Sequence, residues 1–307
     1  MSRGDPLEDP RQRPLVLLAD DWRDFELIDS GDGRKLERYG SLRFIRPEPQ
    51  ALWRPSLPPA AWQADGIFDA DETESGRWRF EGPVPESWVL KWQGLRFAAR
   101  CTPFRHLGFF PEQAPHWNWC STQLAGRAEQ PRVLNLFGYT GLASLAAAAS
   151  GAAVTHVDAS KKSITYAVEN QKLSGLEERP IRWIVDDAMK FVRREVRRGR
   201  RYDGIILDPP KYGRGAKGEI WRLEEQLPEL LALCRELLSD QPAFLLLSVY
   251  AIRLSYLAIQ QAVAEALAPL DGLVRGGEMA LPESSGGRLL PTAIFARWEP
   301  GSSTSSG

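Results

Sequence analysis

The sequence predicts an α/β protein with a mainly parallel sheet, preceded by a small antiparallel β domain. From residue 132 onward, short apolar runs alternate with helical segments, a pattern typical of βαβ units. Before that point, short β-type runs are separated by turn residues. Eight of the eleven tryptophans lie within the first 120 residues. We therefore expect four parts: a disordered N-terminus over 1–14, a Trp-rich β domain over 15–102, a larger α/β domain over 103–300 and a disordered tail over 301–307.

Composition sets limits on the class of protein. The chain has 307 residues, enough for two domains, and its 43% apolar and 26% charged residues exclude a disordered or fibrous protein. The net charge of −1 argues against binding of polyanions by bulk charge alone, although a local basic patch is compatible with it. Cys101, Cys120 and Cys234 are too scattered for a disulfide framework or a zinc site, and the three histidines lack metal spacing. We expect no metal.

The chain shows no sign of a membrane segment. Its N-terminus is polar and lacks the apolar core of a signal peptide. The longest apolar runs, near 142–149 and 243–249, are much shorter than the roughly 18 residues needed to cross a bilayer. Together with cysteines that read as reduced thiols, this predicts a soluble cytoplasmic protein without a membrane partner.

Two hairpins are expected in the β domain. One joins Phe25–Ile28 to Lys35–Tyr39, and the other joins Trp88–Trp92 to Leu95–Ala98 through a Gln-Gly turn. The proline-rich stretch 47–59 cannot be a central strand and should lie on the surface. The tryptophans of this domain fit either its core or a surface that captures substrate.

The larger domain should alternate strands and helices and close with two strands. The expected strands are Arg132–Leu136, Val154–Asp158, Ile181–Val185, Tyr202–Leu207, Ala243–Val249, Leu273–Ala280 and Pro291–Trp298. The expected helices are Leu142–Ser150, a helix capped by Ser160 and running through Ser174, Ala188–Arg198, Glu219–Leu238 with a break or new start at Pro228, and Tyr256–Leu267. Right-handed crossovers follow from this order, and the last two strands should form an antiparallel hairpin at the sheet edge.

Three strand ends carry residues suited to a nucleotide, which binds at the carboxyl ends of strands in such sheets. In the first, Asn135–Gly141, the glycines Gly138 and Gly141 allow a tight turn and a close approach to a ligand. Asp158 ends the second strand 20 residues after Gly138, where a carboxylate can accept both ribose hydroxyls. Asp186-Asp187-Ala188 ends the third, where adenine can be held. Each motif alone is also explained by a turn or a helix N-cap, but their order indicates a nucleotide site.

The fourth strand end favours S-adenosylmethionine over a dinucleotide. A dinucleotide site needs a third glycine where this chain has Ser144, whereas S-adenosylmethionine has no phosphate to cradle. The fourth strand is followed by Asp208-Pro209-Pro210-Lys211-Tyr212. The prolines have no N–H, so we expect their carbonyls to project unpaired and to accept, with Asp208, hydrogen bonds from a base edge. The alternative is a rigid turn with a solvated carboxylate.

These motifs together resemble class I S-adenosylmethionine-dependent methyltransferases, which have a Rossmann-like sheet. They are most similar to the bacterial 23S rRNA methyltransferase group with a D-P-P-K motif, over residues from about 103 to 298. The resemblance implies that 103–300 is the methyltransferase domain. It also implies cofactor contacts by Gln113, Asn135, Phe137, Gly138, Tyr139, Thr140, Gly141, Asp158, Ala159, Asp187, Ala188 and Asp208.

The resemblance implies that the chemistry takes place at Asp208, Pro209 and Pro210, and the residue types suggest roles for Lys211 and Tyr212 beside them. Asp208, Pro209 and Pro210 would face the methyl group and the target base, and Tyr212 would stack on a base. Lys211 would contact a phosphate, position the carboxylate, or simply be a solvated lysine. Cytosine-C5 methyltransferases of this kind carry a cysteine after the fifth strand, where residues 247–251 here have none, so the sequence does not support that chemistry.

The function expected from these residues is methylation of a base in RNA, ribosomal RNA first. A methyltransferase for a small molecule or a protein and an NAD(P)-dependent oxidoreductase are the alternatives. Six arginines between 193 and 201 suit RNA phosphates, but they lie at a helix C-terminus, where cations are favoured in any case, and on the side expected to face away from the cofactor.

Overall fold

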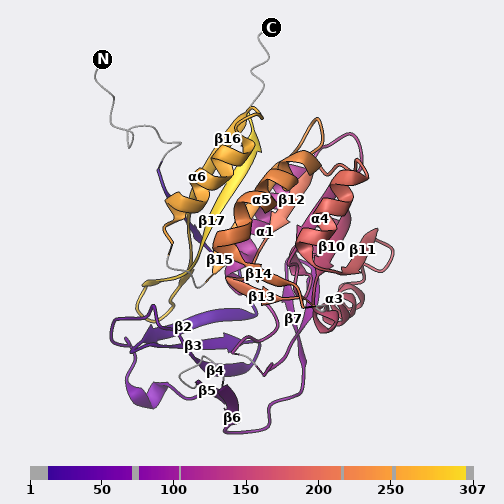
Figure 1. Ribbon diagram of the computed structural model, residues 1–307. Coiled ribbons are helices and arrows are strands. Elements are labelled where there is room, and N and C mark those ends of the chain that lie inside the picture. The colour runs from indigo at the N-terminus through magenta and orange to yellow at the C-terminus, as the bar shows by residue number, and fades with distance from the viewer. Residues whose placement is uncertain (1–12, 71–75, 104, 216–217, 251–253, 302–307) are drawn as a thin grey trace, which may run out of the picture.

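The computed structural model describes residues 13–70, 76–103, 105–215, 218–250 and 254–301 (Figure 1). The ends expected to be disordered lie almost entirely outside the described residues. The large sheet has eight strands in the order β1-β16-β17-β15-β12-β9-β10-β11. The N-terminal region forms a five-stranded sheet and a separate two-stranded hairpin, on the side of the large sheet where β13 and β14 lie (Figure 1). The expected α/β architecture is confirmed.

Five neighbouring parallel strands form one side of the large sheet, with β11 at its edge. They are β9 (Arg132–Leu136), β10 (Ala153–Asp158), β11 (Ile181–Val185), β12 (Gly204–Leu207) and β15 (Phe244–Tyr250). The side chains of β9, β10, β12 and β15 are largely buried on both faces because helices cover the sheet on either side, which is why these strands read as apolar runs. Strand β11 is more exposed, with Val185 at 46%.

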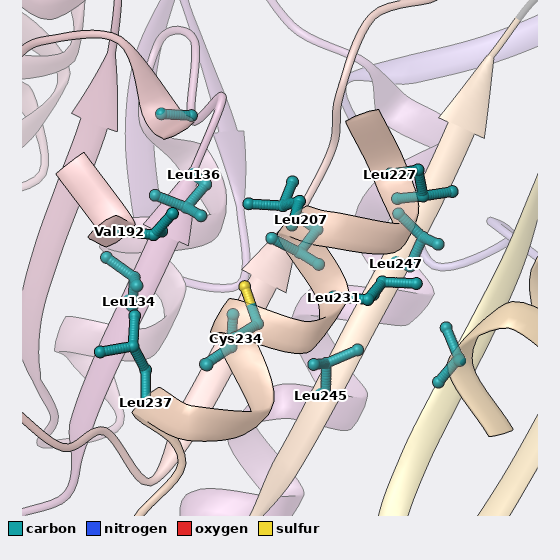
Figure 2. Close-up of a cluster of buried hydrophobic side chains, with 14 of the residues drawn as sticks. Leu134, Leu136, Val192, Leu207, Leu227, Leu231, Cys234, Leu237, Leu245 and Leu247 are labelled. Atoms are coloured by element: carbon teal, nitrogen blue, oxygen red, sulfur yellow. The ribbon is translucent and has the colours of Figure 1, made fainter. Parts of the chain in front are cut away.

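Three helices cover each face. One face carries α1 (Ala114–Leu124), α2 (Leu142–Ala149) and α3 (Lys161–Leu173), and the other carries α4 (Ala188–Arg197), α5 (Leu223–Leu237) and α6 (Tyr256–Leu267). Figure 2 shows the second face, where Leu231 and Cys234 of α5 pack over Leu207 and Leu245. Cys234 is a buried core residue, as the sequence indicated. The cap of α3 is also confirmed, since the Ser160 hydroxyl accepts a hydrogen bond from the Ser163 N–H.

The edge of the sheet differs from expectation. The hairpin of β16 (Gly272–Pro282) and β17 (Leu289–Pro300) is antiparallel, as predicted, and β17 pairs with β15. It is not the edge, however, because β1 (Leu15–Leu18) pairs in parallel with β16 outside it. Residues 15–18, expected in the β domain, therefore belong to the large sheet.

A second difference lies after β12. Residues 220–222, expected in the first turn of a helix, instead form β14 (Ile220–Arg222), which pairs with β13 (Tyr212–Arg214) in a hairpin. Helix α5 starts at Leu223 and runs without interruption through Pro228. Pro228 is the sixth residue of the helix, and it removes one intrahelical hydrogen bond without ending the helix.

The N-terminal region contains both predicted hairpins, one within its five-stranded sheet and one separate from it. Its strands are β2 (Phe25–Gly31), β3 (Arg34–Tyr39), β4 (Leu42–Pro47), β5 (Gly66–Ala70) and β6 (Gly76–Phe80), and the separate hairpin is β7 (Trp88–Trp92) with β8 (Leu95–Ala99). A short 3-10 helix, η2 (Pro59–Ala61), lies within the proline-rich stretch. The sheet is not purely antiparallel, because β4 and β5 pair in parallel.

Seven of the eight early tryptophans pack in hydrophobic core clusters, whereas the Trp62 indole N–H donates to Asp29. Trp22 is at their centre, with ring-centroid separations of 5.6 to 6.1 Å from Phe25, Trp92, Phe97, Phe109 and Trp117. All eight are buried or half-buried. This supports the core alternative rather than an exposed aromatic surface.

Polar contacts attach the N-terminal region to the large domain. The Ala98 N–H of β8 donates to Asn170 of α3 at 2.9 Å, and Arg100 pairs with Glu169 at 2.8 Å. The buried Ser30 hydroxyl donates to Glu283 at 2.6 Å. Over the described residues, no helix combines the length and apolarity needed to span a bilayer, and no three His, Cys, Asp or Glu side chains come together in a way that could hold a metal.

Candidate active site

A cavity lies at the carboxyl ends of β9, β12 and β15. Several predicted site residues border it, namely Gln113, Asn135, Phe137, Gly138, Tyr139, Thr140, Gly141 and Asp208. Phe109 and Phe110 also border it, within the stretch 106–113 that resembles the segment packing over the cofactor in the related family, and so does Cys120, for which the sequence favoured a structural role. Trp117, Leu142, Ala143, Ile206, Leu246 and Ser248 complete the lining and were not predicted as site residues. The cavity thus has a polar end at Asp208 and an apolar remainder.

The loop after β9 forms one wall and has an unusual backbone. Phe137 and Tyr139 have φ values of 57° and 51°, in the left-handed region that side chains rarely adopt. Such residues each cost about 1–3 kcal/mol and persist only where their surroundings hold them. Here the Gly138 N–H donates to Val157 at 3.2 Å. A Cβ on Gly138 would lie 2.3 Å from the His156 ring, so only glycine lets the loop rest on β10.

Two predicted contact residues use their polar side-chain atoms within the protein. The Asn135 amide donates to the Ser144 hydroxyl at 2.9 Å, and that hydroxyl lies 2.9 Å from Nδ1 of His156. Burial lowers the pKa of His156 to about 3, so this ring is neutral. The Thr140 hydroxyl donates to the Gly108 carbonyl at 2.6 Å. Both side chains therefore fix the loop instead of presenting free polar groups to a ligand.

Asp158 lies at the end of β10, outside the cavity lining. Its carboxylate accepts hydrogen bonds from the Tyr139 N–H at 2.9 Å and the Ser160 N–H at 2.8 Å, one on each oxygen. Burial raises the pKa of Asp158, and these two backbone donors oppose that rise. Each oxygen can accept a further hydrogen bond, so the carboxylate remains able to hold a diol. Ala159 follows it directly, also beyond the cavity lining.

At the end of β11, the structure fits the helix-cap explanation of the aspartates. Asp187 is the N-cap of α4 and accepts from the Lys190 N–H at 2.9 Å. Asp186 pairs with Arg194 at 2.8 Å. The cap uses only Oδ1 of Asp187, and Ala188 is buried at the first helical position. Neither Asp187 nor Ala188 borders the cavity.

Asp208 is the most perturbed carboxyl group of the site. Ser248 on β15 donates to its Oδ1 at 2.9 Å, and Gln113 donates to its Oδ2 at 3.3 Å. Gln113 belongs to a short 3-10 helix, η3 (Pro111–Gln113), and also donates to the Ser248 hydroxyl at 3.0 Å. Burial raises the pKa of Asp208 to about 7, with the hydrogen bond from Ser248 opposing the rise and nearby Glu112 adding to it. The sequence pointed to Ser248 only as the place of a missing cysteine.

The residues after Asp208 correct one expectation. The Pro210 carbonyl is not free, because the Trp221 indole N–H donates to it at 2.6 Å. Pro209 is buried and Pro210 is exposed. Lys211 and Tyr212 are exposed and do not border the cavity. The structure thus brings Asp208 to the cavity and leaves Lys211 and Tyr212 outside it.

The arginine cluster and the cysteines fit structural roles. Three of the arginines have carboxylate partners, in the pairs Arg193–Glu229, Arg194–Asp186 and Arg198–Glu195. Cys120 borders the cavity but is buried, and burial raises the pKa of its thiol to about 12. A thiol with that pKa stays protonated at neutral pH.

Known proteins with similar sequences and structures are methyltransferases. The model of the S-adenosylmethionine-dependent methyltransferase family matches residues 70–246. The chain is 26% identical over 196 residues to ribosomal RNA large subunit methyltransferase K of Neisseria meningitidis, covering 61% of this chain and 54% of that protein. It is 32% identical over 179 residues to methyltransferase K/L of Hahella chejuensis, covering 57% of this chain and 22% of that protein. The chain thus spans about half the length of the first relative and less of the second.

Solved structures extend the likeness to nearly the whole chain. A SAM-dependent methyltransferase from Agrobacterium tumefaciens is 50% identical, with a TM-score of 0.91 and 94% of each chain covered. SMU.776, a methyltransferase solved in complex with SAH, is 19% identical with a TM-score of 0.72, covers 91% of this chain and 76% of that one, and so shares the fold. The chain belongs to the S-adenosylmethionine-dependent methyltransferase family.

Proposed function

We propose that the protein transfers a methyl group from S-adenosylmethionine to a nitrogen of a base in RNA, ribosomal RNA first. The observation that carries this proposal is Asp208, a half-buried carboxyl group at the cavity wall. Ser248 and Gln113 hold it through hydrogen bonds, and burial raises its pKa to about 7. A carboxyl group with that pKa can take up a proton near neutral pH. The names of the curated relatives support ribosomal RNA as the acceptor.

The cofactor is S-adenosylmethionine, and the NAD(P) alternative is set aside by the family match. We propose that the two free acceptor positions of Asp158 hold the ribose hydroxyls, and that Asp187 and Ala188 hold the adenine. The loop from Phe137 to Gly141 would line the methionine and ribose side. These residues supply hydrogen-bond acceptors for the ribose and adenine of the cofactor. They do not form a phosphate-binding loop, and S-adenosylmethionine, which has no phosphate, does not need one.

Asp208 would act on the methyl acceptor. Bound S-adenosylmethionine supplies a methyl group already activated by its sulfonium. The protein must hold the acceptor in line with that group and remove the proton that the nitrogen loses. Ser248 and Gln113 each donate to one oxygen of Asp208, which fixes the orientation of its carboxyl group. Gln113 is thus proposed as a positioning residue rather than a direct cofactor contact.

The contacts of Ser248 and Cys120 favour nitrogen over carbon as the acceptor. Methylation at C5 of a pyrimidine requires a thiolate that adds to the ring first. The residue at the place of that cysteine is Ser248, whose hydroxyl donates a hydrogen bond to Asp208. Burial raises the pKa of the Cys120 thiol to about 12, so it does not supply a thiolate either. Among the described residues, no other cysteine borders the cavity.

Methyl transfer to ribosomal RNA tests the proposal. The RNA is isolated from a strain that lacks the gene, incubated with protein and tritiated S-adenosylmethionine, and digested to nucleosides for mass spectrometry. We expect an N-methylated nucleoside, lost with Asp208→Asn and retained with Asp240→Asn, a matched change at an exposed aspartate. Label on a carbon would contradict the nitrogen assignment. Label on a protein or small molecule, with the RNA unlabelled, would refute RNA as the substrate.

A further inference from the structure

The β13–β14 hairpin has two chemically different faces. It begins four residues after Asp208, and its register pairs Tyr212 with Arg222, Gly213 with Trp221 and Arg214 with Ile220. Successive side chains on a strand point to opposite sides. Tyr212, Arg214, Ile220 and Arg222 therefore share one face, and Trp221 with Gly213 share the other. The exposure follows this division, because the first four are exposed and Trp221 is 4% exposed.

The inner face attaches the hairpin to the catalytic and cofactor loops. The Trp221 N–H donates to the Pro210 carbonyl at 2.6 Å, two residues from Asp208. The Trp221 ring lies 4.9 Å from the Phe137 ring, measured between centroids. These contacts hold the hairpin at the carboxyl end of β12, where Figure 1 shows it.

The outer face carries groups that bind single-stranded nucleic acid. Tyr212 and Ile220 are 48% and 50% exposed. The Tyr212 hydroxyl accepts a hydrogen bond from Nε of Arg214 at 2.8 Å, which holds a guanidinium beside an aromatic ring. Arg222 lies on the same face and is also exposed. Stacking on an aromatic ring and contact of phosphates with arginine are the two interactions that proteins use on single strands.

The position of this face makes RNA the partner that fits it. Four residues of extended chain span at most about 14 Å, so Tyr212 lies within that distance of Asp208. The nucleotide next to a target base at Asp208 could therefore reach the hairpin. The arginine cluster at the end of α4 is not close to Asp208. Helix α4 starts at the carboxyl end of β11 and runs back toward the amino ends of the parallel strands.

We propose that the outer face of the β13–β14 hairpin docks the single-stranded RNA that flanks the target base. The proposal rests on the function proposed above and adds the surface that recognises the substrate. Tyr212 stacks on a base, and Arg214 and Arg222 contact the phosphates. Through Trp221, the docked strand is connected to the Pro210 carbonyl and the cofactor loop.

Binding of a short fluorescein-labelled single-stranded RNA, followed by anisotropy over a range of salt concentrations, tests this. Tyr212→Ala should weaken binding at least about fivefold, the smallest effect expected for losing one stacked base. Arg214→Ala should lower the slope of log Kd against log salt by about one. Affinity for S-adenosylhomocysteine should not change in either variant, which also shows that they fold.

Arg197→Ala and Arg200→Ala are matched controls, since both arginines are exposed at the far end of α4. Retained RNA affinity in these variants, with loss in the hairpin variants, would support the proposal. The reverse pattern, or unchanged affinity in all four, would overturn it. If the wild-type protein binds no RNA, RNA is not the substrate and the proposed function is wrong. The wild-type measurement therefore distinguishes a failure of the proposed function from a failure of the docking proposal, which only the variants test.

Discussion

The difference in free energy of unfolding between the Asp208→Asn variant and the wild type should shift in favour of the variant as the pH rises. Burial raises the pKa of Asp208 from 3.8 to about 7. Between these pH values the folded protein holds a proton that the unfolded chain has released. The stability contributed by this carboxyl group is present in full below pH 3.8 and is lost as the pH rises through about 7. Asparagine does not titrate, so the variant lacks this loss.

The magnitude follows from the pKa. A change from 3.8 to about 7 corresponds to about 4 kcal/mol at 1.36 kcal/mol per pH unit. Asp208 is only partly buried by its exposed area, so solvent screening reduces this value. Only the part of this stability change that occurs between pH 5 and about pH 7 lies within the measured range. From pH 5 to pH 8 we therefore expect the stability difference between Asp208→Asn and the wild type to grow by about 2 kcal/mol.

Urea unfolding at pH 5 and pH 8 measures this difference directly. The exposed Asp240→Asn variant serves as the control, and its difference from the wild type should stay constant. A constant difference for Asp208→Asn as well, or one that falls with pH, would refute the argument that burial raises this pKa.

Activity should depend on pH in the opposite direction. If ionised Asp208 takes the proton of the acceptor, kcat/KM should rise with pH and level off above about 7. Asp208→Asn should lower it about 100-fold or more and abolish the rise. The pH that favours activity thus disfavours stability, because both depend on ionising the same buried group.

Three further substitutions test the cofactor and catalytic loops. Asp158→Ala should weaken binding of S-adenosylhomocysteine by about 1–3 kcal/mol in calorimetry, and unchanged affinity would place the ribose elsewhere. Gly138→Ala should lower stability to urea by about 1–3 kcal/mol, because its Cβ would lie 2.3 Å from His156, whereas Gly82→Ala meets nothing within 4 Å and should be neutral. Trp221→Phe leaves the Pro210 carbonyl without its partner and should lower kcat more than cofactor affinity, so an equal loss of both would contradict a role in the catalytic loop.

The sequence was sufficient for every strand of the large sheet except β1, whereas β4, β5, β6 and the β13–β14 hairpin also escaped prediction. Runs such as Ile205–Leu207 are buried on both faces, so their composition alone identifies them. Ile220–Arg222 alternates like a strand, but three residues are too few to distinguish a period of 2 from a period of 3.6. Leu15–Leu18 pairs with Gly277–Ala280, and nothing near it in the sequence indicates a partner so distant.

For the candidate site, the sequence predicted which residues border the cavity better than it predicted the hydrogen-bond partners of their polar groups. Asp208 comes to the cavity because strand ends of a parallel sheet meet at one edge. The hydroxyl of Thr140 and the carbonyl of Pro210 turn to Gly108 and Trp221, partners that only the tertiary fold brings near. The role of Ser248 was hidden for the same reason, since its contact with Asp208 joins two separate strands.

The helical turn η3 lies between charged groups of the N-terminal sheet and the candidate active site. Glu112 is buried, and Lys35 and Arg46 of the N-terminal sheet oppose the rise that burial causes in its pKa. The next residue, Gln113, donates to Asp208. Arg46 is itself held by a buried ion pair at 2.7 Å with Glu37, and breaking such a pair costs about 3–5 kcal/mol. The charges of the N-terminal sheet thus act on Glu112, the residue next to the side chain that donates to Asp208.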